Sequence, residues 1–371
     1  MGKKAKERIK LVTDKFKDMS LDALLITDIR NVKYLTKFSG SSGFLLLTGD
    51  RAIFVTDFRY KTQAEEEVSG LELRIEKEKL PDNIEKLVKE LNIKTMGIEA
   101  NALSFNHYKK ISEKLNGVEL IPTTDIIESL RIVKGDEEIS SIKKAIEIAE
   151  GSFNSILDIL RPGMIEKDIA LTLEYEMRKR GSGPVPFDII VASGERSALP
   201  HATSSSKPLE EGDLLIIDWG AEADGYFCDI TRTFIIGNNP PSPPFTKGEA
   251  GGLSDKRKIY EAVLNAQTEA IRNVKPGMTF SGLDAVARDF IKDAGYGEYF
   301  GHGLGHGIGL SVHEAPHISW QGEEVLKEGM VFTIEPGIYI PGFGGVRIED
   351  MVLVRGNGVE VLTHLPKELI L

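Results

Sequence analysis

The stretch GHGLGHGIGLSVHE, residues 301–314, holds three of the chain's seven histidines, His302, His306 and His313. Imidazoles bind metal ions and transfer protons near neutral pH, so this density marks a candidate site. A zinc helix of the H-E-x-x-H type places a glutamate after its first histidine, where this chain has Gly303. Repeated glycines disfavour a helix, which predicts a strand or loop with close backbone approach. A turn-rich loop with exposed histidines is the alternative.

Four acidic residues accompany the histidines at the ends of apolar runs. Asp218 ends LEEGDLLIID and Glu335 ends the similar LKEGMVFTIE, each six residues after a glycine. A second acid follows on each returning strand, Asp229 in YFCDITRTF and Glu349 in GVRIEDMVLV. The preceding segments LRPGMIEKDIALTLEYEMRKRG and VKPGMTFSGLDAVARDFIKDAG also share one plan of turn, helix and closing glycine. We therefore predict two similar halves that each bring two acids to a common centre.

The first pair of acids flanks the sequence EADG, which predicts a β-hairpin. A four-residue loop at 222–225 would set Asp218 opposite Asp229, and a two-residue Asp224-Gly225 turn would make them diagonal neighbours. Both registers put the carboxylates on one face, where like charges repel and are costly to bury. Either one acid is protonated or a cation lies between them; two solvated acids are the alternative. Cys228 points to the opposite face and is predicted to be a packing residue.

The chemistry of these groups points to a metal centre. Four carboxylates and an imidazole without a thiolate suit hard or borderline divalent ions, with Mn²⁺ favoured and Co²⁺ or Zn²⁺ as alternatives. Two ions about 3.5–4 Å apart can share a water, lower its pKa and stabilise both oxygens of a displacement. The reaction implied is hydrolysis of an acyl bond.

The rest of the chain must position this centre. Residues 1–127 interleave apolar runs such as ALLIT and GFLLLT with helix-like segments such as NIEKLVKEL, which predicts a unit of alternating helices and strands. A turn and a long amphipathic helix follow, so we predict domains at 1–130 and 131–371. The Pro/Gly-rich segment 238–254 predicts a flexible, exposed insertion, with a ligand-binding loop as the less favoured alternative.

Composition and charge exclude several classes of function. A length of 371 residues favours two domains, and a net charge of -11 argues against a nucleic-acid partner. No apolar run approaches the length of a membrane span, and the basic N-terminus lacks the apolar core of a signal peptide. The single cysteine excludes an internal disulfide framework and a Cys-rich metal site. We expect a cytoplasmic protein.

The ordered motifs DWGAEADGYFCDITRTF, GHGLGHGIGLSVHE, TIEPGIYIPG and VRIEDMVLV resemble those of the pita-bread metallopeptidases, and among them the Xaa-Pro peptidases, aminopeptidase P and prolidase. NVKYLTKFSGSSGFLLLT and TDFRYKTQAEEE resemble the creatinase/prolidase N-terminal domain. The resemblance covers nearly the whole chain apart from the insertion. It implies an α+β fold: a C-terminal pita-bread domain with pseudo-twofold duplicated halves around a curved antiparallel sheet, plus a smaller α/β creatinase-like N-terminal domain.

The resemblance also implies a ligand set for two divalent metal ions. Asp218 would bind one ion, and His306 and Glu335 would bind the other. Asp229 and Glu349 would bridge the two ions.

Other residues would act beside the metal ions. His201, in SALPHATSS, would lie with His302 and His313 on the substrate side of the cleft. These histidines would steady the scissile carbonyl or pass a proton to the departing proline nitrogen, which must be protonated to leave. Glu335 would exchange a proton with the bridging water. Arg347 would orient the carboxylate of Glu349, unless it is a simple surface charge.

The function implied is hydrolysis of the bond preceding proline in short peptides by a homodimer. Xaa-Pro aminopeptidase activity, which releases the N-terminal residue, is favoured, and Xaa-Pro dipeptidase (prolidase) activity is the alternative. A dipeptidase needs a cation for the product's carboxylate, which the sequence does not locate. Methionine aminopeptidases usually lack the long N-terminal domain, and creatinase does not use this metal set. A non-catalytic peptide-binding protein on the same scaffold would be marked by loss of a ligand.

Overall fold

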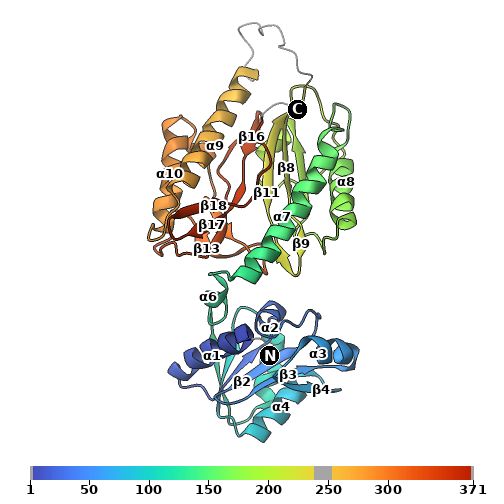
Figure 1. Ribbon diagram of the computed structural model, residues 1–371, viewed down its shortest axis with the longest axis vertical. Helices are drawn as coiled ribbons and strands as arrows, with labels where there is room; N and C mark the ends of the chain where they lie inside the picture. The colour runs from blue at the N-terminus through green and yellow to red at the C-terminus, as the bar shows by residue number, and fades with distance from the viewer. Residues whose placement is uncertain (1–2, 238–252, 369–371) are drawn as a thin grey trace. The chain divides into compact units, whose positions relative to one another are not determined.

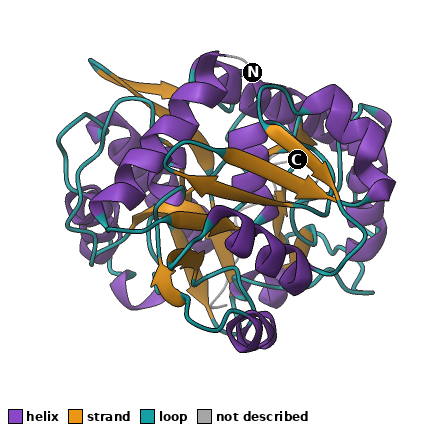
Figure 2. Cartoon of the chain, turned by 90° about the horizontal axis from the view of Figure 1, so that it is seen from below, coloured by secondary structure: helices purple, strands orange, loops and turns teal. Residues whose placement is uncertain are grey.

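The structure is a computed structural model that describes residues 3–237 and 253–368. The chain divides into two compact units, Met1–Arg131 and Ile132–Leu371, and both combine helices with strands (Figures 1 and 2). Within the described ranges, no helix is long and apolar enough to cross a membrane. The insertion expected at 238–254 lies outside the described residues, except for its last two positions, which begin a helix.

The first unit is built on a mixed sheet with strand order β4-β3-β2-β1-β5-β6. Its strands are β1 (Ala23–Ile26), β2 (Phe44–Thr48), β3 (Ala52–Thr56), β4 (Glu72–Ile75), β5 (Thr95–Glu99) and β6 (Glu119–Thr123). Its helices are α1 (Lys3–Asp18), α2 (Ile29–Thr36), η1 (Phe58–Tyr60), α3 (Lys61–Glu67), α4 (Leu80–Leu91), α5 (Phe105–Lys114) and α6 (Glu128–Arg131). β1 pairs antiparallel with β2 and parallel with β5, and its ALLI run is buried throughout, as expected of an inner strand. The predicted α/β character of this unit is confirmed.

The second unit contains two halves. The first half comprises α7 (Asp136–Leu157), α8 (Glu166–Lys179), β7 (Ile190–Ser193), η2 (Gly194–Ala198), β8 (Leu214–Trp219), β9 (Glu222–Ala223), β10 (Tyr226–Phe227) and β11 (Ile230–Ile235). The second half comprises α9 (Leu253–Asn273), α10 (Phe280–Asp293), η3 (Gly297–Tyr299), β12 (Gly305–Gly307), β13 (Glu314–Ile318), β14 (Val331–Ile334), β15 (Gly337–Ile340), β16 (Gly344–Arg347), β17 (Asp350–Arg355) and β18 (Gly358–Val361). In Figure 1, α7 and α8 flank the strands on one side and α9 and α10 on the other.

The predicted duplication is visible in the backbone. The Pro-Gly-Met turns before α8 and α10 place Gly163 and Gly277 at φ 88° and 84°. Gly212 and Gly329 have φ values of 85° and 86°, and β8 and β14 each begin two residues later. Positive φ is the conformation that glycine adopts without the penalty other residues incur. The repeated sequence pattern therefore encodes a repeated chain path.

The two halves meet through the strands that carry the acids. β7, β8 and β11 form one antiparallel sheet, and β13-β12-β14-β17-β18 form another. They are linked where Thr231 of β11 pairs with Glu349, just before β17. The buried guanidinium of Arg232 donates to the carbonyl oxygen of Glu349 at 2.6 Å and pairs with Asp350 at 2.8 Å. This junction holds the acids of both halves on one connected backbone.

Candidate metal centre and substrate pocket

The hairpin of the first half places two carboxylates on one face. Asp224 and Gly225 form a two-residue turn with φ values of 55° and 85°, and Thr231 pairs with Asp218. Positive φ at both turn residues matches the right-handed twist of the strands. Asp229 is therefore a diagonal neighbour of Asp218, and the four-residue loop at 222–225 is the wrong alternative. Cys228 is buried in the hydrophobic core of the first half, where its Sγ accepts from the backbone nitrogen of Ala221 at 3.2 Å.

The second half supplies the other two acids. Glu335 directly follows β14, and its Oε1 accepts a hydrogen bond from Thr333 Oγ1 at 3.0 Å. Glu349 lies between β16 and β17, and its Oε2 accepts from Thr231 Oγ1 at 2.7 Å. Sequence reasoning missed Thr231. Thr231 could have been found from its position two residues after Asp229, because side chains two positions apart on a strand lie on the same face.

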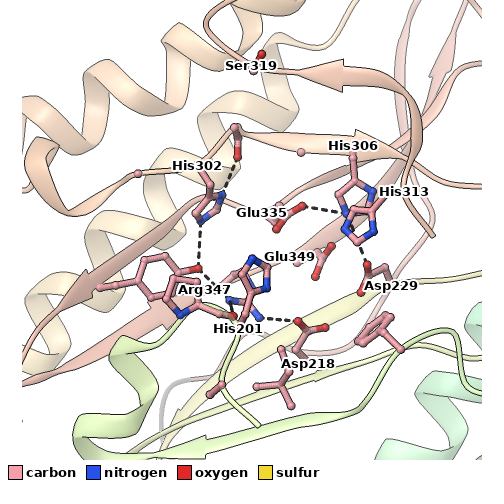
Figure 3. A pocket seen from close by; sticks show the side chains of 18 of the residues that line it. His201, Asp218, Asp229, His302, His306, His313, Ser319, Glu335, Arg347 and Glu349 are labelled. Carbon is pink, nitrogen blue, oxygen red and sulfur yellow. Dashed lines mark hydrogen bonds and ion pairs between the residues drawn. The ribbon is translucent and has the colours of Figure 1, made fainter. Parts of the chain in front are cut away.

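His306 reaches these acids from β12. Its Nδ1 faces the carbonyl oxygen of Gly307 at 3.1 Å, and its Nε2 lies 3.2 Å from Glu335 Oε1 and 3.7 Å from Asp229 Oδ2 (Figure 3). Because a carbonyl oxygen only accepts, Nδ1 carries the proton and the lone pair of Nε2 points at the carboxylates. Nε2 of His306 is therefore oriented toward the acids, as the nitrogen of a metal-binding histidine would be.

Steric constraints require glycine on both sides of His306. A Cβ on Gly305 would lie 1.9 Å from the carbonyl oxygen of Thr333, and one on Gly307 would lie 2.2 Å from that of Ala315. Neighbouring strands therefore pass too close for any side chain. The predicted strand with close backbone approach is what the structure shows.

We expect Gly305→Ala to lower the free energy of unfolding by about 1–3 kcal/mol, because the added methyl group must push the β14 backbone away. Gly301→Ala is the matched control, since a Cβ there would have no atom within 4 Å. Urea unfolding of both variants measures the difference. Equal stability of the two variants would contradict the steric explanation.

The acids are buried without the hydrogen bonds that would satisfy them. Asp218 Oδ1, Asp229 Oδ1 and Glu349 Oε1 have no hydrogen-bond partner in the described structure. Burial raises the pKa of Asp229, and the negative charges of Glu349, Asp218 and Glu335 raise it further. Burial likewise raises the pKa of Glu349 and of Glu335. A buried group of acids with unsatisfied oxygens is what a bound cation would stabilise.

The donor set fits a divalent ion. Asp229, His306 and Glu349 each offer one ligand atom, and these atoms lie within 4.8 Å of one another. Asp218 and Glu335 line the same pocket. Carboxylate oxygens and an imidazole nitrogen suit Mn²⁺, Co²⁺ and Zn²⁺. All five residues expected to bind metal are therefore brought together.

The pocket has a volume of about 830 Å³, and His201, His302 and His313 also line it. His201 and His313 are exposed, and the rings of His313 and His306 lie 4.1 Å apart. Burial lowers the pKa of His302, and the pocket wall that covers part of the His313 ring, together with the neighbouring His306, lowers the pKa of His313. The structure thus also places the histidines expected on the substrate side around the acids (Figure 3).

Arg347 is buried, but its partner differs from the one expected. Its Nη2 donates to Asp218 Oδ2 at 2.6 Å, whereas the carboxylate of Glu349 is held by Thr231 instead. Its Nη1 donates to the hydroxyl of Tyr339 at 2.9 Å, and this hydroxyl lies 3.1 Å from His302 Nε2. Arg347 reaches Glu349 only through Thr231, whose Oγ1 accepts from Arg347 Nε at 3.0 Å, so the role expected of it toward Glu349 stays a prediction. Tyr339, which sequence reasoning did not single out, links Arg347 to His302.

Comparisons with known proteins agree with this architecture. The model of metallopeptidase family M24 matches residues 140–356, and that of the creatinase/prolidase N-terminal domain matches residues 8–133. The chain is 43% identical to an Xaa-Pro dipeptidase of Pyrococcus furiosus over 98% of this chain and 100% of that protein.

Solved structures agree as well. An Xaa-Pro dipeptidase from Bacillus anthracis superposes with a TM-score of 0.93 at 43% identity, covering 99% of this chain and 100% of that one. An X-Pro aminopeptidase from Thermotoga maritima superposes with a TM-score of 0.86 at 40% identity, covering 98% of this chain and 99% of that one. The chain therefore belongs to metallopeptidase family M24 and carries a creatinase/prolidase N-terminal domain in front of its pita-bread domain.

Proposed function

We propose that this protein is an Xaa-Pro dipeptidase that hydrolyses the bond preceding proline in dipeptides with the help of two divalent ions. The observation that carries the proposal is the full-length similarity to Xaa-Pro dipeptidases, at 43% identity, together with the acids and histidines gathered in one pocket. The sequence motifs favoured an Xaa-Pro aminopeptidase. The named dipeptidase relatives support the dipeptidase alternative better.

The ligand assignment follows the pocket. We assign Asp218 to one ion, His306 and Glu335 to the other, and Asp229 and Glu349 to both, with Mn²⁺ favoured over Co²⁺ or Zn²⁺. Bound divalent ions supply Lewis acidity and lower the pKa of a water that attacks the scissile carbonyl.

The chain's own groups handle the protons. Glu335 is the carboxylate that we assign to exchange a proton with the attacking water, since it lies beside His306 in the pocket. His302 is held between the carbonyl oxygen of Gly303 at 2.8 Å and the hydroxyl of Tyr339. His201 and His313 are exposed in the pocket and are the groups that we assign to the scissile carbonyl and the leaving proline nitrogen. Proline's tertiary amide nitrogen needs such a proton donor to depart.

A matched pair of substrates tests the proposal. Mn²⁺-loaded protein is incubated with an Xaa-Pro dipeptide and an Xaa-Pro-Yaa tripeptide, and mass spectrometry identifies the products. We expect cleavage of the dipeptide alone, and no cleavage of an Xaa-Ala dipeptide. Release of free Xaa from the tripeptide would instead establish the aminopeptidase, the second candidate, which the similarity to the Thermotoga maritima structure supports. Failure to cut either with Mn²⁺, Co²⁺ or Zn²⁺ would favour a non-catalytic peptide-binding protein.

A further inference from the structure

The residues on either side of His302 are glycines, which have no side chain to hold the backbone at this point. Gly301 and Gly303 flank the histidine, and a Cβ on Gly301 would have no atom within 4 Å. The imidazole is fixed at its tip by Tyr339, but its backbone needs a separate support. Glycine is the residue with the most conformational freedom to lose, so such a segment holds its position only where other groups bind its backbone.

That support comes from Arg288 on α10. Its Nη1 donates to the carbonyl oxygen of Phe300 at 2.9 Å, and its Nη2 donates to that of His302 at 2.7 Å. Its guanidinium carbon also lies 4.2 Å from the centre of the Phe300 ring and 4.7 Å from that of Trp320. A planar guanidinium can make all these contacts at once, because its donors point in fixed directions and its faces stack on aromatic rings.

Asp284 orients the guanidinium from one turn earlier on α10. Its carboxylate is 1% exposed and accepts from Arg288 Nε at 2.7 Å and from Arg288 Nη2 at 2.9 Å. The same carboxylate accepts from the backbone nitrogen of Leu304 at 3.0 Å. The Asp284–Arg288 pair therefore binds the chain on both sides of His302. Phe300 extends the support, since its ring meets the imidazole edge to face at 5.1 Å.

The first half of the domain holds its own histidine loop in a comparable way. Glu166, at the start of α8, is buried and accepts from the backbone nitrogens of Ser193 at 2.7 Å and Ser205 at 3.1 Å. These residues lie on either side of the loop that carries His201. In both halves, the helix after the Pro-Gly-Met turn thus supplies a buried carboxylate that fastens a loop lining the pocket.

We propose that Arg288 is a positioning residue for His302, which sets the imidazole against the substrate without touching the substrate or the metal ions; this inference rests on the proposed function. The metal ligand His306 is fixed separately, because its backbone nitrogen donates to Thr333 Oγ1 at 3.0 Å. Loss of Arg288 should therefore act on turnover through His302 while the Mn²⁺ affinity stays unchanged.

The test is a double-mutant cycle with Arg288→Gln and His302→Ala. We expect Arg288→Gln to lower kcat about 10- to 100-fold, the size expected for a small misplacement of a reacting group, with little change in KM. In the His302→Ala background the same change should have almost no further effect. Arg272→Gln, at an exposed helical arginine paired with Glu269, is the matched control and should leave kcat unchanged. Additive losses would overturn the proposal, since Arg288 would then act independently of His302.

A spectroscopic measurement separates this inference from the proposed function. In full-length protein loaded with diamagnetic Zn²⁺ and labelled with ¹⁵N-histidine, His302→Ala identifies the ring signals of His302 among those of the seven histidines. Arg288→Gln should move these signals and leave those of His306 in place. Arg288→Lys, which keeps the charge and serves if the glutamine variant does not fold, should move them as well. Unmoved His302 signals overturn the inference, whereas wild-type protein that cuts no Xaa-Pro peptide overturns only the proposed function.

Discussion

Asp229→Asn is expected to abolish peptidase turnover while the protein stays folded. The substitution keeps the shape of the side chain and removes the charge that we assign to both metal ions. Changes in groups that merely support metal ligands already cost about 10- to 100-fold, so we expect a loss of at least about 100-fold here. Hydrolysis of an Xaa-Pro dipeptide across a range of Mn²⁺ concentrations measures it.

The same variant should lose the stabilisation by metal that the wild type shows. Without metal, Asp229 repels Glu349, Asp218 and Glu335, so an uncharged amide should stabilise the metal-free fold or leave it unchanged. The wild type should gain about 2.7 kcal/mol in unfolding free energy at a Mn²⁺ concentration of 100 times its Kd, and the variant should gain almost nothing. Asp289→Asn, at an exposed site on α10, is the control. A variant that keeps Mn²⁺-dependent turnover and stabilisation would refute the metal assignment.

The sequence predicted the parts of the site that local patterns encode. An apolar strand that ends in an acid, a turn that returns the chain and a second acid recur in both halves, and each is a short-range feature. The hairpin register was left open, because EADG allows two turn lengths. Positive φ at both Asp224 and Gly225 selects the shorter turn, and this preference is set by the twist of the flanking strands.

The contacts between the halves could not be read from local patterns. Arg347 and Glu349 are two positions apart, which would put them on one face of a strand, yet Glu349 lies outside β16 and β17, where alternation no longer applies. The Arg347 side chain instead crosses to Asp218, 129 positions earlier in the chain. Tyr339 and Arg288 were missed for the same reason, since only the folded chain brings them to His302. A long side chain therefore carries little information about its partner until the backbone is known.

Arg347→Met is expected to lower the free energy of unfolding of the metal-free protein by about 3–5 kcal/mol, the cost of removing one partner of a buried ion pair. The side chain is 5% exposed and pairs with Asp218 Oδ2 at 2.6 Å. It also donates to Thr231 Oγ1 at 3.0 Å and to the carbonyl oxygen of Pro200, beside His201, at 3.2 Å. Methionine fills much of the space but leaves the Asp218 carboxylate without its counter-charge. Urea unfolding in the presence of a chelator measures the loss.

Three further variants separate the charge of Arg347 from its geometry. Arg355→Met removes an arginine from a partly exposed pair with Glu360 and should cost less than about 1 kcal/mol. Tyr339→Phe removes the hydroxyl that hydrogen-bonds both Arg347 and His302, and should cost about 1–3 kcal/mol. Arg347→Lys keeps the charge but cannot reach Asp218, Tyr339 and Thr231 together, so it should restore part of the stability and little of the turnover. If Arg347→Met cost no more than Arg355→Met, the pair with Asp218 would be incidental, and the carboxylate would need another source of stabilisation in the metal-free protein.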